Sequence, residues 1–203
     1  MPSGTIVNFP HDDAAVRSAL HRKKLQHFKS LPDTLVVDEL GLAHAKSRVD
    51  IAVINGCVHG YEIKSGLDTL DRLPLQIKTY SETLEKLTVV CASKHLDGVM
   101  RLVPEWCGIL EAQQGKRGAI HFQSVRRCRS NPDVNPVMLA HLLWRPEVVA
   151  LLSRHGIAPR ELRKPRKHLY HALAELLTPK EITAAIREFM RQRVSWRDRP
   201  ALA

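Results

Sequence analysis

The stretch that most constrains the fold is "RVDIAVINGCVHGYEIKS", residues 48–65. Apolar and β-branched residues flank an Asn-Gly dipeptide at 55–56, and this dipeptide is a strong signal for a two-residue β-hairpin turn. Two antiparallel strands are therefore expected, one on each side of the turn. The first strand carries Asp50, and the second carries Glu62 and Lys64. Charged side chains inside an apolar, β-prone segment suggest a polar site.

The pattern around this hairpin predicts an α/β fold, with a central mixed sheet flanked by helices. Asp12 or Asp13 is positioned to cap the first helix, and Pro74 is expected near the start of the second or at a kink in it. The expected elements besides the hairpin strands are a helix over 11–30, a strand over 34–42, a helix over 67–86, and strands over 87–93 and 107–113.

The C-terminal third differs in character from the rest of the chain. Residues 126–136 are polar and turn-rich, which is typical of a linker. The residues after them have helical periodicity, and Thr178 with Glu181 forms a capping box. The predicted organisation is a core over 1–125, a linker over 126–136 and a basic helical subdomain over 137–203.

The net charge of +10 is concentrated in that C-terminal part. Up to Val125 there are 15 Lys and Arg against 14 Asp and Glu, whereas from Arg126 onward there are 16 against 7. Such asymmetry favours a polyanionic partner, most simply nucleic acid, although a solubilising face gives the same count. The candidate nucleic-acid-binding residues cluster near a helix start; they are Arg163, Lys164, Arg166 and Lys167.

Several classes of protein are disfavoured by the sequence. The four cysteines contain no C-x-x-C pair, which argues against a zinc site or a disulfide scaffold and suits a reducing cytoplasm. No apolar run is long enough to span a membrane, and no signal peptide is expected at the N-terminus. The motifs G-x-S-x-G and G-x-x-x-x-G-K-[ST] are missing, which disfavours a triad hydrolase and an NTPase.

The hairpin brings its charged residues together. Residues two apart on a strand face the same side, so Glu62 and Lys64 point together. Folding about the turn places Asp50 beside Glu62, allowing one residue of register or a bulge. Two neighbouring carboxylates, with the backbone carbonyl of Ile63, suit a hard cation such as Mg²⁺ or Mn²⁺. The alternative is a salt bridge from Lys64 to either acid.

These residues resemble the PD-(D/E)XK nuclease superfamily, which has an Asp on one strand and E-x-K on the next. Asp50 and Glu62-Ile63-Lys64, within "GYEIKS", match that pattern, and the similarity covers residues 34–93. The resemblance implies a restriction-endonuclease-like core and Mg²⁺-dependent hydrolysis of phosphodiester bonds, with DNA the favoured substrate. Val49 stands where the superfamily often has proline.

The resemblance also implies further site residues. Glu39 matches an additional upstream acid, although alternation along the strand would place only one of Asp38 and Glu39 on the Asp50 face. Gln76 matches a catalytic position on the following helix, and Tyr80, one turn later, a nucleic-acid contact; both also suit an ordinary helix surface. Two functions are therefore expected: a metal-dependent nuclease or, alternatively, a non-cleaving nucleic-acid-binding, repair or mobile-element accessory protein.

Overall fold

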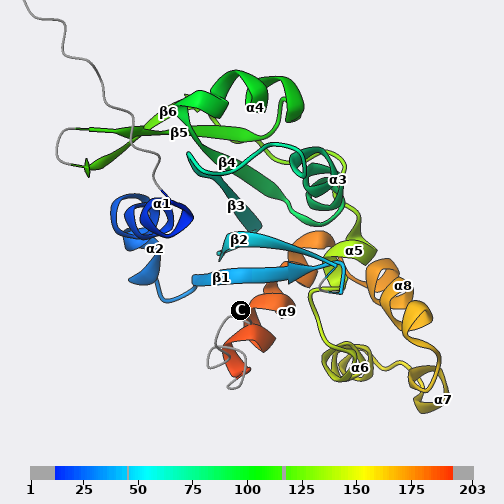
Figure 1. The fold of residues 1–203 in the computed structure, drawn as a ribbon. Helices are drawn as coiled ribbons and strands as arrows, with labels where there is room; N and C mark the ends of the chain where they lie inside the picture. The colour runs from blue at the N-terminus through cyan, green and yellow to red at the C-terminus, as the bar shows by residue number, and fades with distance from the viewer. Residues whose placement is uncertain (1–11, 45, 116–117, 194–203) are drawn as a thin grey trace, which may run out of the picture.

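The computed structural model describes residues 12–44, 46–115 and 118–193. In this part of the chain, one mixed sheet has the strand order β1-β2-β3-β4-β5-β6 (Figure 1). The pairs β3–β4 and β4–β5 are parallel and the other neighbours are antiparallel. The strands are β1 (Leu35–Leu42), β2 (Ser47–Ile54), β3 (Val58–Lys64), β4 (Lys86–Ala92), β5 (Gly108–Gln114) and β6 (Ile120–Arg126). The α/β class expected from the sequence is confirmed.

The hairpin of β2 and β3 turns through three residues, one more than the Asn-Gly signal predicts. The last strand pair is Ile54 with Val58, which leaves 55–57 in the loop, and Gly56 has a φ of +113°. A positive φ of this size favours glycine because it has no Cβ. The additional loop residue is the one-residue change of register allowed for above, and it places Asp50 across from Glu62.

Helices connect the parallel strands, as parallel pairing requires. The helix α3 (Leu73–Thr83) joins β3 to β4, and Pro74 lies in its first turn. The 3₁₀ turn η2 (Ser93–His95) and the helix α4 (Leu96–Leu102) join β4 to β5. The sequence pattern did not indicate α4 or β6. The helix is only seven residues long, and the edge strand β6 is mostly exposed, so neither has a clear hydrophobic period.

One face of the sheet is covered by the N-terminal helix. It runs as α1 (Asp13–Leu20), a π-helical turn η1 (His21–Leu25) and α2 (Gln26–Lys29). Asp12 caps it, because its carboxylate accepts a hydrogen bond from the Ala15 amide at 2.8 Å. Its buried side chains pack against inward residues of β2 to β6, and this cluster is separate from the core on the other face.

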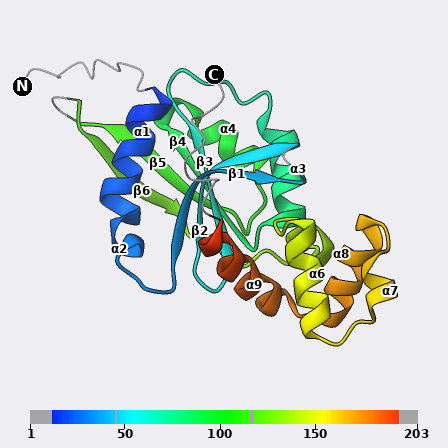
Figure 2. The same cartoon turned by 90° about the horizontal axis from the view of Figure 1, so that it is seen from below.

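The opposite face is covered by α3, α4 and the C-terminal helices, with α9 beneath the first strands and α6 to α8 extending to one side (Figure 2). The C-terminal helices are α5 (Pro136–Ala140), α6 (Arg145–Arg154), α7 (Pro159–Leu162), α8 (Arg166–Leu176) and α9 (Pro179–Gln192). Residues of α5, α6, α8 and α9 belong to the same hydrophobic cluster as the sheet. The subdomain boundaries expected from the sequence stay a prediction.

The segment expected to be a linker is fixed to the core. The side-chain amide of Asn131 donates to the carbonyls of Ser81 and Leu84, both at 2.7 Å, and Asn131 is 6% exposed. The expected capping box at Thr178 and Glu181 is present at the start of α9. Among the described helices, none is long and apolar enough to cross a membrane.

Candidate functional site

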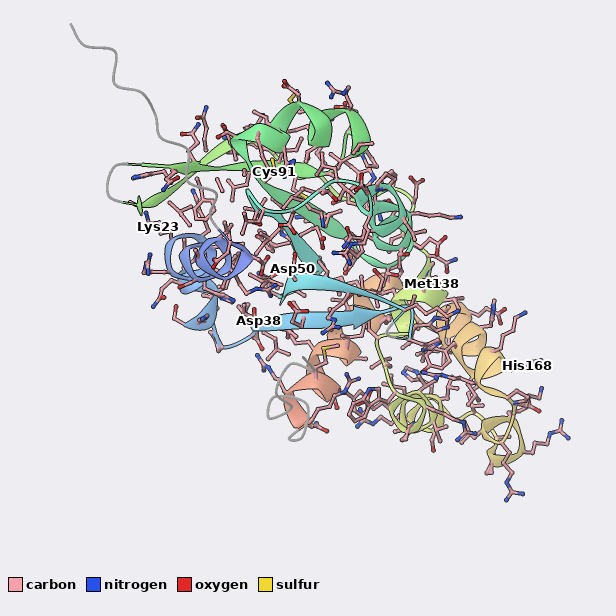
Figure 3. All side chains as sticks on the ribbon, viewed as in Figure 1. Lys23, Asp38, Asp50, Cys91, Met138 and His168 are labelled. Carbon is pink, nitrogen blue, oxygen red and sulfur yellow. The ribbon has the colours of Figure 1, made fainter. Side chains whose placement is uncertain are left out.

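A pocket of about 810 Å³ opens where β1, β2 and β3 meet the start of α3. Asp50, in the middle of β2, lies near the centre of the sheet (Figure 3). The pocket includes most of the residues that the sequence selected, and both acids and bases line it. Its charged and amide lining residues are Asp13, Glu39, Lys46, Arg48, Asp50, Glu62, Lys64, Asp68, Arg72 and Gln76.

Asp50 lies where β2 and β3 separate. The paired register of the two strands ends at Ile51 and Tyr61, and the amide of Ile63 donates to the Asp50 Oδ2 atom at 2.6 Å. The side chain thus satisfies a β3 donor that β2 no longer reaches through its backbone. The Oδ1 atom of Asp50 accepts from Arg17 at 3.0 Å, and Arg17 also donates to the Asp50 carbonyl at 2.7 Å.

Glu62 is the centre of a buried hydrogen-bond network. It is 2% exposed, and its Oε1 atom accepts from Lys64 Nζ and from the Gln76 amide, each at 2.7 Å. Its Oε2 atom lies 2.7 Å from the hydroxyl of Tyr80. The Lys64–Glu62 salt bridge named as the alternative is therefore present, and α3 supplies the remaining donors.

Glu39 is brought to the same site by an unusual backbone conformation. Its φ is +57°, which is uncommon for a residue other than glycine. Glu39 accepts from Arg17 at 2.7 Å, while the preceding Asp38 pairs with His21 at 2.7 Å. Consecutive residues of β1 therefore both contact the N-terminal helix, Glu39 through Arg17 of α1 and Asp38 through His21 of η1, so the simple alternation used to choose between them fails here.

The buried acids repel each other. Desolvation, followed by the charge of Glu62, raises the pKa of Asp50 to about 7, against the opposing effects of the Ile63 amide and Arg17. Burial, followed by the charge of Glu62, also raises the pKa of Tyr80, so its hydroxyl stays protonated. The pocket therefore favours an added positive charge near Asp50.

Arg17 supplies that charge, although no motif in the sequence identified it as a site residue. Its guanidinium is an ion-pair partner of Asp13, Glu39 and Asp50, at 3.1, 2.7 and 3.0 Å. These acids come from a helix and two strands, so one side chain holds α1 against the sheet. An Arg four residues after an Asp is common on helix surfaces, which is why spacing alone did not single it out.

The expected Mg²⁺ or Mn²⁺ does not fit the donors as they are arranged. All four carboxylate oxygens of Asp50 and Glu62 already accept hydrogen bonds from the protein. The N–H of Ile63, and not the carbonyl expected to be a ligand, contacts Asp50. Among the described residues, no group of three or more His, Cys, Asp or Glu side chains is arranged to hold a metal ion. A bound divalent cation stays a prediction that requires Arg17 to move.

The predicted nucleic-acid-binding residues lie in two different environments. Arg163, Lys164, Arg166 and Lys167 are exposed, between α7 and the first turn of α8. Tyr80 is 0% exposed, and its hydroxyl lies 2.7 Å from the Arg48 carbonyl as well as from Glu62. A direct contact of Tyr80 with nucleic acid is therefore wrong for this structure, because no ring surface reaches solvent.

Comparison with known proteins identifies the family. Residues 14–200 match the model of the family described as Bacteriophage P4 protein cII. The chain belongs to this family. "Protein cII" of Enterobacteria phage P4 is 30% identical over 160 residues, which cover 79% of this chain and 58% of that protein. The chain thus corresponds to somewhat over half of the phage protein's length. No solved structure matches it.

This finding corrects the resemblance drawn from the hairpin. The match is to the cII family and not to the PD-(D/E)XK nucleases, so the expected nuclease and hydrolase activity is wrong. The physical reason is that the resemblance rests on a motif of only three charged residues, Asp50, Glu62 and Lys64. An Asp and an E-x-K on paired strands also form a closed network in which Lys64 neutralises Glu62 and Asp50 completes the hydrogen bonding of β3.

Proposed function

We propose that this member of the cII family is a nucleic-acid-binding accessory protein of a phage or related mobile element, without cleavage activity. The basic surface between α7 and α8 carries the proposal. The side chains of Arg163 and Lys167 are exposed there, and no carboxylate within the described residues pairs with either. Unpaired cations on a surface gain most from meeting phosphates, because binding releases counterions.

The charge distribution of the chain supports the same surface. Three bases at the pocket are paired with its acids: Arg17 with Asp50, Arg48 with Glu39, and Lys64 with Glu62. The lining of the pocket contains five Asp and Glu side chains against four Lys and Arg side chains. Most of the net positive charge lies beyond Arg126. A polyanion is therefore attracted to the C-terminal helices more than to the pocket, and duplex DNA is the favoured ligand.

The arrangement of the core is consistent with a binding protein that keeps the fold but does not cut. A helix, three antiparallel strands, a helix and a parallel strand follow one another from α1 to β4. We infer that this core is restriction-endonuclease-like in architecture. The closed network around Glu62 then serves to hold β3 and α3 together.

Binding is tested by titrating labelled duplex DNA with the full chain at several salt concentrations between 50 and 200 mM. Replacing Arg163, Lys164 and Lys167 by glutamine is expected to weaken binding. The slope of log affinity against log salt should fall by about 0.9 for each lost phosphate contact. Single-stranded DNA and duplex RNA in parallel titrations establish the preferred ligand.

A matched control removes the same charge elsewhere. Arg22, Lys24 and Lys29 are exposed on the N-terminal helix, and Figure 3 shows Lys23 of this helix far from His168 of α8. Their replacement by glutamine should change affinity and slope much less. A larger loss of affinity in this control than in the first variant would show that the N-terminal helix is the binding surface. A wild-type chain that binds no nucleic acid at 50 mM salt would overturn the proposed function.

A further inference from the structure

A second pocket, of about 470 Å³, lies between the β1–β2 turn, α8 and the two ends of the segment that joins α5 to α6. It adjoins the first pocket, since Glu39 lines both. Two histidines, two arginines and a tryptophan dominate its lining, and the family match assigns it no role. These residues are His44, His141, Trp144, Arg166 and Arg193.

The centre of this pocket is a cluster of His44, His141, Arg166 and Tyr170. The two imidazole rings lie 4.1 Å apart between centroids, and His141 lies edge-on to the Tyr170 ring at 4.7 Å. Arg166 donates to the Nδ1 atom of His44 at 2.8 Å, so the remaining proton of a neutral His44 is on Nε2. The Nδ1 atom of His141 is buried and has no hydrogen-bond partner in the part of the chain that the structure describes.

Backbone strain holds His44 in place. Ala43 and His44 have φ values of +48° and +59°, a conformation that residues with a Cβ adopt at a cost. No glycine occupies either position, although a glycine would relieve the strain. The turn directs the His44 ring against His141 and Arg166, which come from the C-terminal helices about a hundred residues later.

The cluster is deficient in negative charge. Within residues 12–44, 46–115 and 118–193, no carboxylate pairs with Arg166, whose partners are His44 and the Tyr170 hydroxyl. Glu39 lines the pocket but is paired with Arg17 and Arg48. Desolvation, followed by the charge of His44 and then Arg166, lowers the pKa of His141 to about 4, so the two rings lie together uncharged.

We propose that this second pocket binds the phosphate group of a nucleotide, either free or at the end of a strand, with Arg166, His44 and His141 contacting the phosphate. This deepens the proposed function and rests on it for the strand-end ligand. A planar guanidinium and two imidazoles present several N–H donors to one anion. The volume suits a single nucleotide. Trp144 is 48% exposed at the edge, where its ring can meet a base.

The test uses the full chain and four probes in calorimetric titrations: inorganic phosphate, adenosine 5′-monophosphate, and one short oligonucleotide with a 5′-phosphate or a 5′-hydroxyl. The strand with the 5′-phosphate is expected to bind at least about tenfold more tightly than the strand with the 5′-hydroxyl. Charge-assisted hydrogen bonds to a single phosphate provide a difference of this size. Arg166→Gln should remove this difference. Arg22→Gln, at an exposed arginine of the N-terminal helix outside both the pocket and the basic surface, should preserve it.

Two further measurements separate a binding site from a structural role. Arg166→Lys keeps the charge but loses the planar donor fork, so it should fold normally and still lose most of the discrimination. A bound phosphate beside the uncharged rings should raise the pKa of His141 above its value of about 4, and NMR titration of the ring with and without phosphate measures that shift. The groups around the two rings that also shape it are Arg166, Lys46, His171, Tyr170 and Glu39.

The outcomes are distinct for the two proposals. If both strands bind equally, or if Arg166→Gln weakens them to the same extent, Arg166 is an ordinary backbone contact and the phosphate pocket is refuted. If neither strand binds while adenosine monophosphate does, the nucleic-acid function fails and the pocket is a free-nucleotide site. Failure of both inorganic phosphate and the mononucleotide to bind, together with no 5′-phosphate preference, also overturns the pocket.

Discussion

Tyr80→Phe measures how strongly the buried network around Glu62 stabilises the fold. The change removes only an oxygen that lies 2.7 Å from the Glu62 carboxylate and from the Arg48 carbonyl. A hydrogen bond to a charged acceptor contributes about 1.5–3 kcal/mol, and the buried carboxylate then lacks one donor. We expect the free energy of unfolding to fall by about 2 kcal/mol. For a chain of this size the melting temperature should fall by about 4–8 °C.

Tyr170→Phe is the matched control, because both tyrosine rings are fully buried. The Tyr170 hydroxyl donates to the carbonyl of Leu143 at 2.6 Å, which is a neutral acceptor, and accepts a longer hydrogen bond from Arg166 at 3.2 Å. Its loss should cost about 1 kcal/mol. Urea unfolding at pH 7.5, monitored by circular dichroism, gives both values on one scale.

The difference between the two tyrosines must come from the charge of Glu62 if the network is correctly described. A double-mutant cycle with Glu62→Gln isolates it, and the coupling between Tyr80 and Glu62 should exceed about 1 kcal/mol. Equal costs for the two tyrosine variants, or a coupling near zero, would refute the argument that Tyr80 acts by stabilising a buried carboxylate.

Three other predictions concern the core and the pocket. Gly60→Ala should lower the free energy of unfolding by about 1–3 kcal/mol in urea titrations, because an added Cβ would lie 2.5 Å from Leu84 Cδ1 and 3.1 Å from Val49 Cγ2. An unfolding curve that coincides with the wild type's would contradict this. Burial, followed by the charge of Lys86, lowers the pKa of His59 to about 4, so the unfolded chain binds more protons between that value and pH 6.5. Stability should therefore decrease by about 1–3 kcal/mol as the pH falls through that range, and a His59→Gln profile as steep as the wild type would contradict this. In calorimetry, the Arg17→Gln variant should bind Mn²⁺ more tightly than the wild type does. If Asp50→Asn abolishes Mn²⁺ binding but Arg17→Gln leaves the affinity unchanged, the guanidinium does not compete with the cation.

The sequence predicted the parts of the fold that have strong local patterns. The hairpin, the buried strand β4 and the capped helix α9 follow from alternation, an apolar run and a capping box. The register of the hairpin was less certain, because Asn-Gly occurs in two-residue and longer turns alike. The edge strand β6 was missed because one edge and much of its surface meet solvent, which removes the alternation.

The sequence predicted which residues form the site better than it predicted what they do. Asp50, Glu62, Lys64 and Gln76 do meet in one pocket, because strand pairing and the following helix bring them there. Their roles depend on Arg17, which reaches the site because its helix packs against strands that are distant in the sequence. No local sequence pattern identifies such a contact. The same residues therefore match a catalytic motif in the sequence but form a neutralised hydrogen-bond network in the structure.

The position of unpaired charge is the property that links the two proposals. In the first pocket, Lys64 and Arg17 are held within 3.0 Å of carboxylates, so an incoming phosphate would have to compete with covalently tethered anions at high effective concentration. Arg166 and its histidines face no such competitor within the described residues, and the exposed bases beside them extend the same field toward solvent. A polyanion should therefore contact the C-terminal helices first and place a phosphate at Arg166, leaving the Asp50 pocket as support for the sheet.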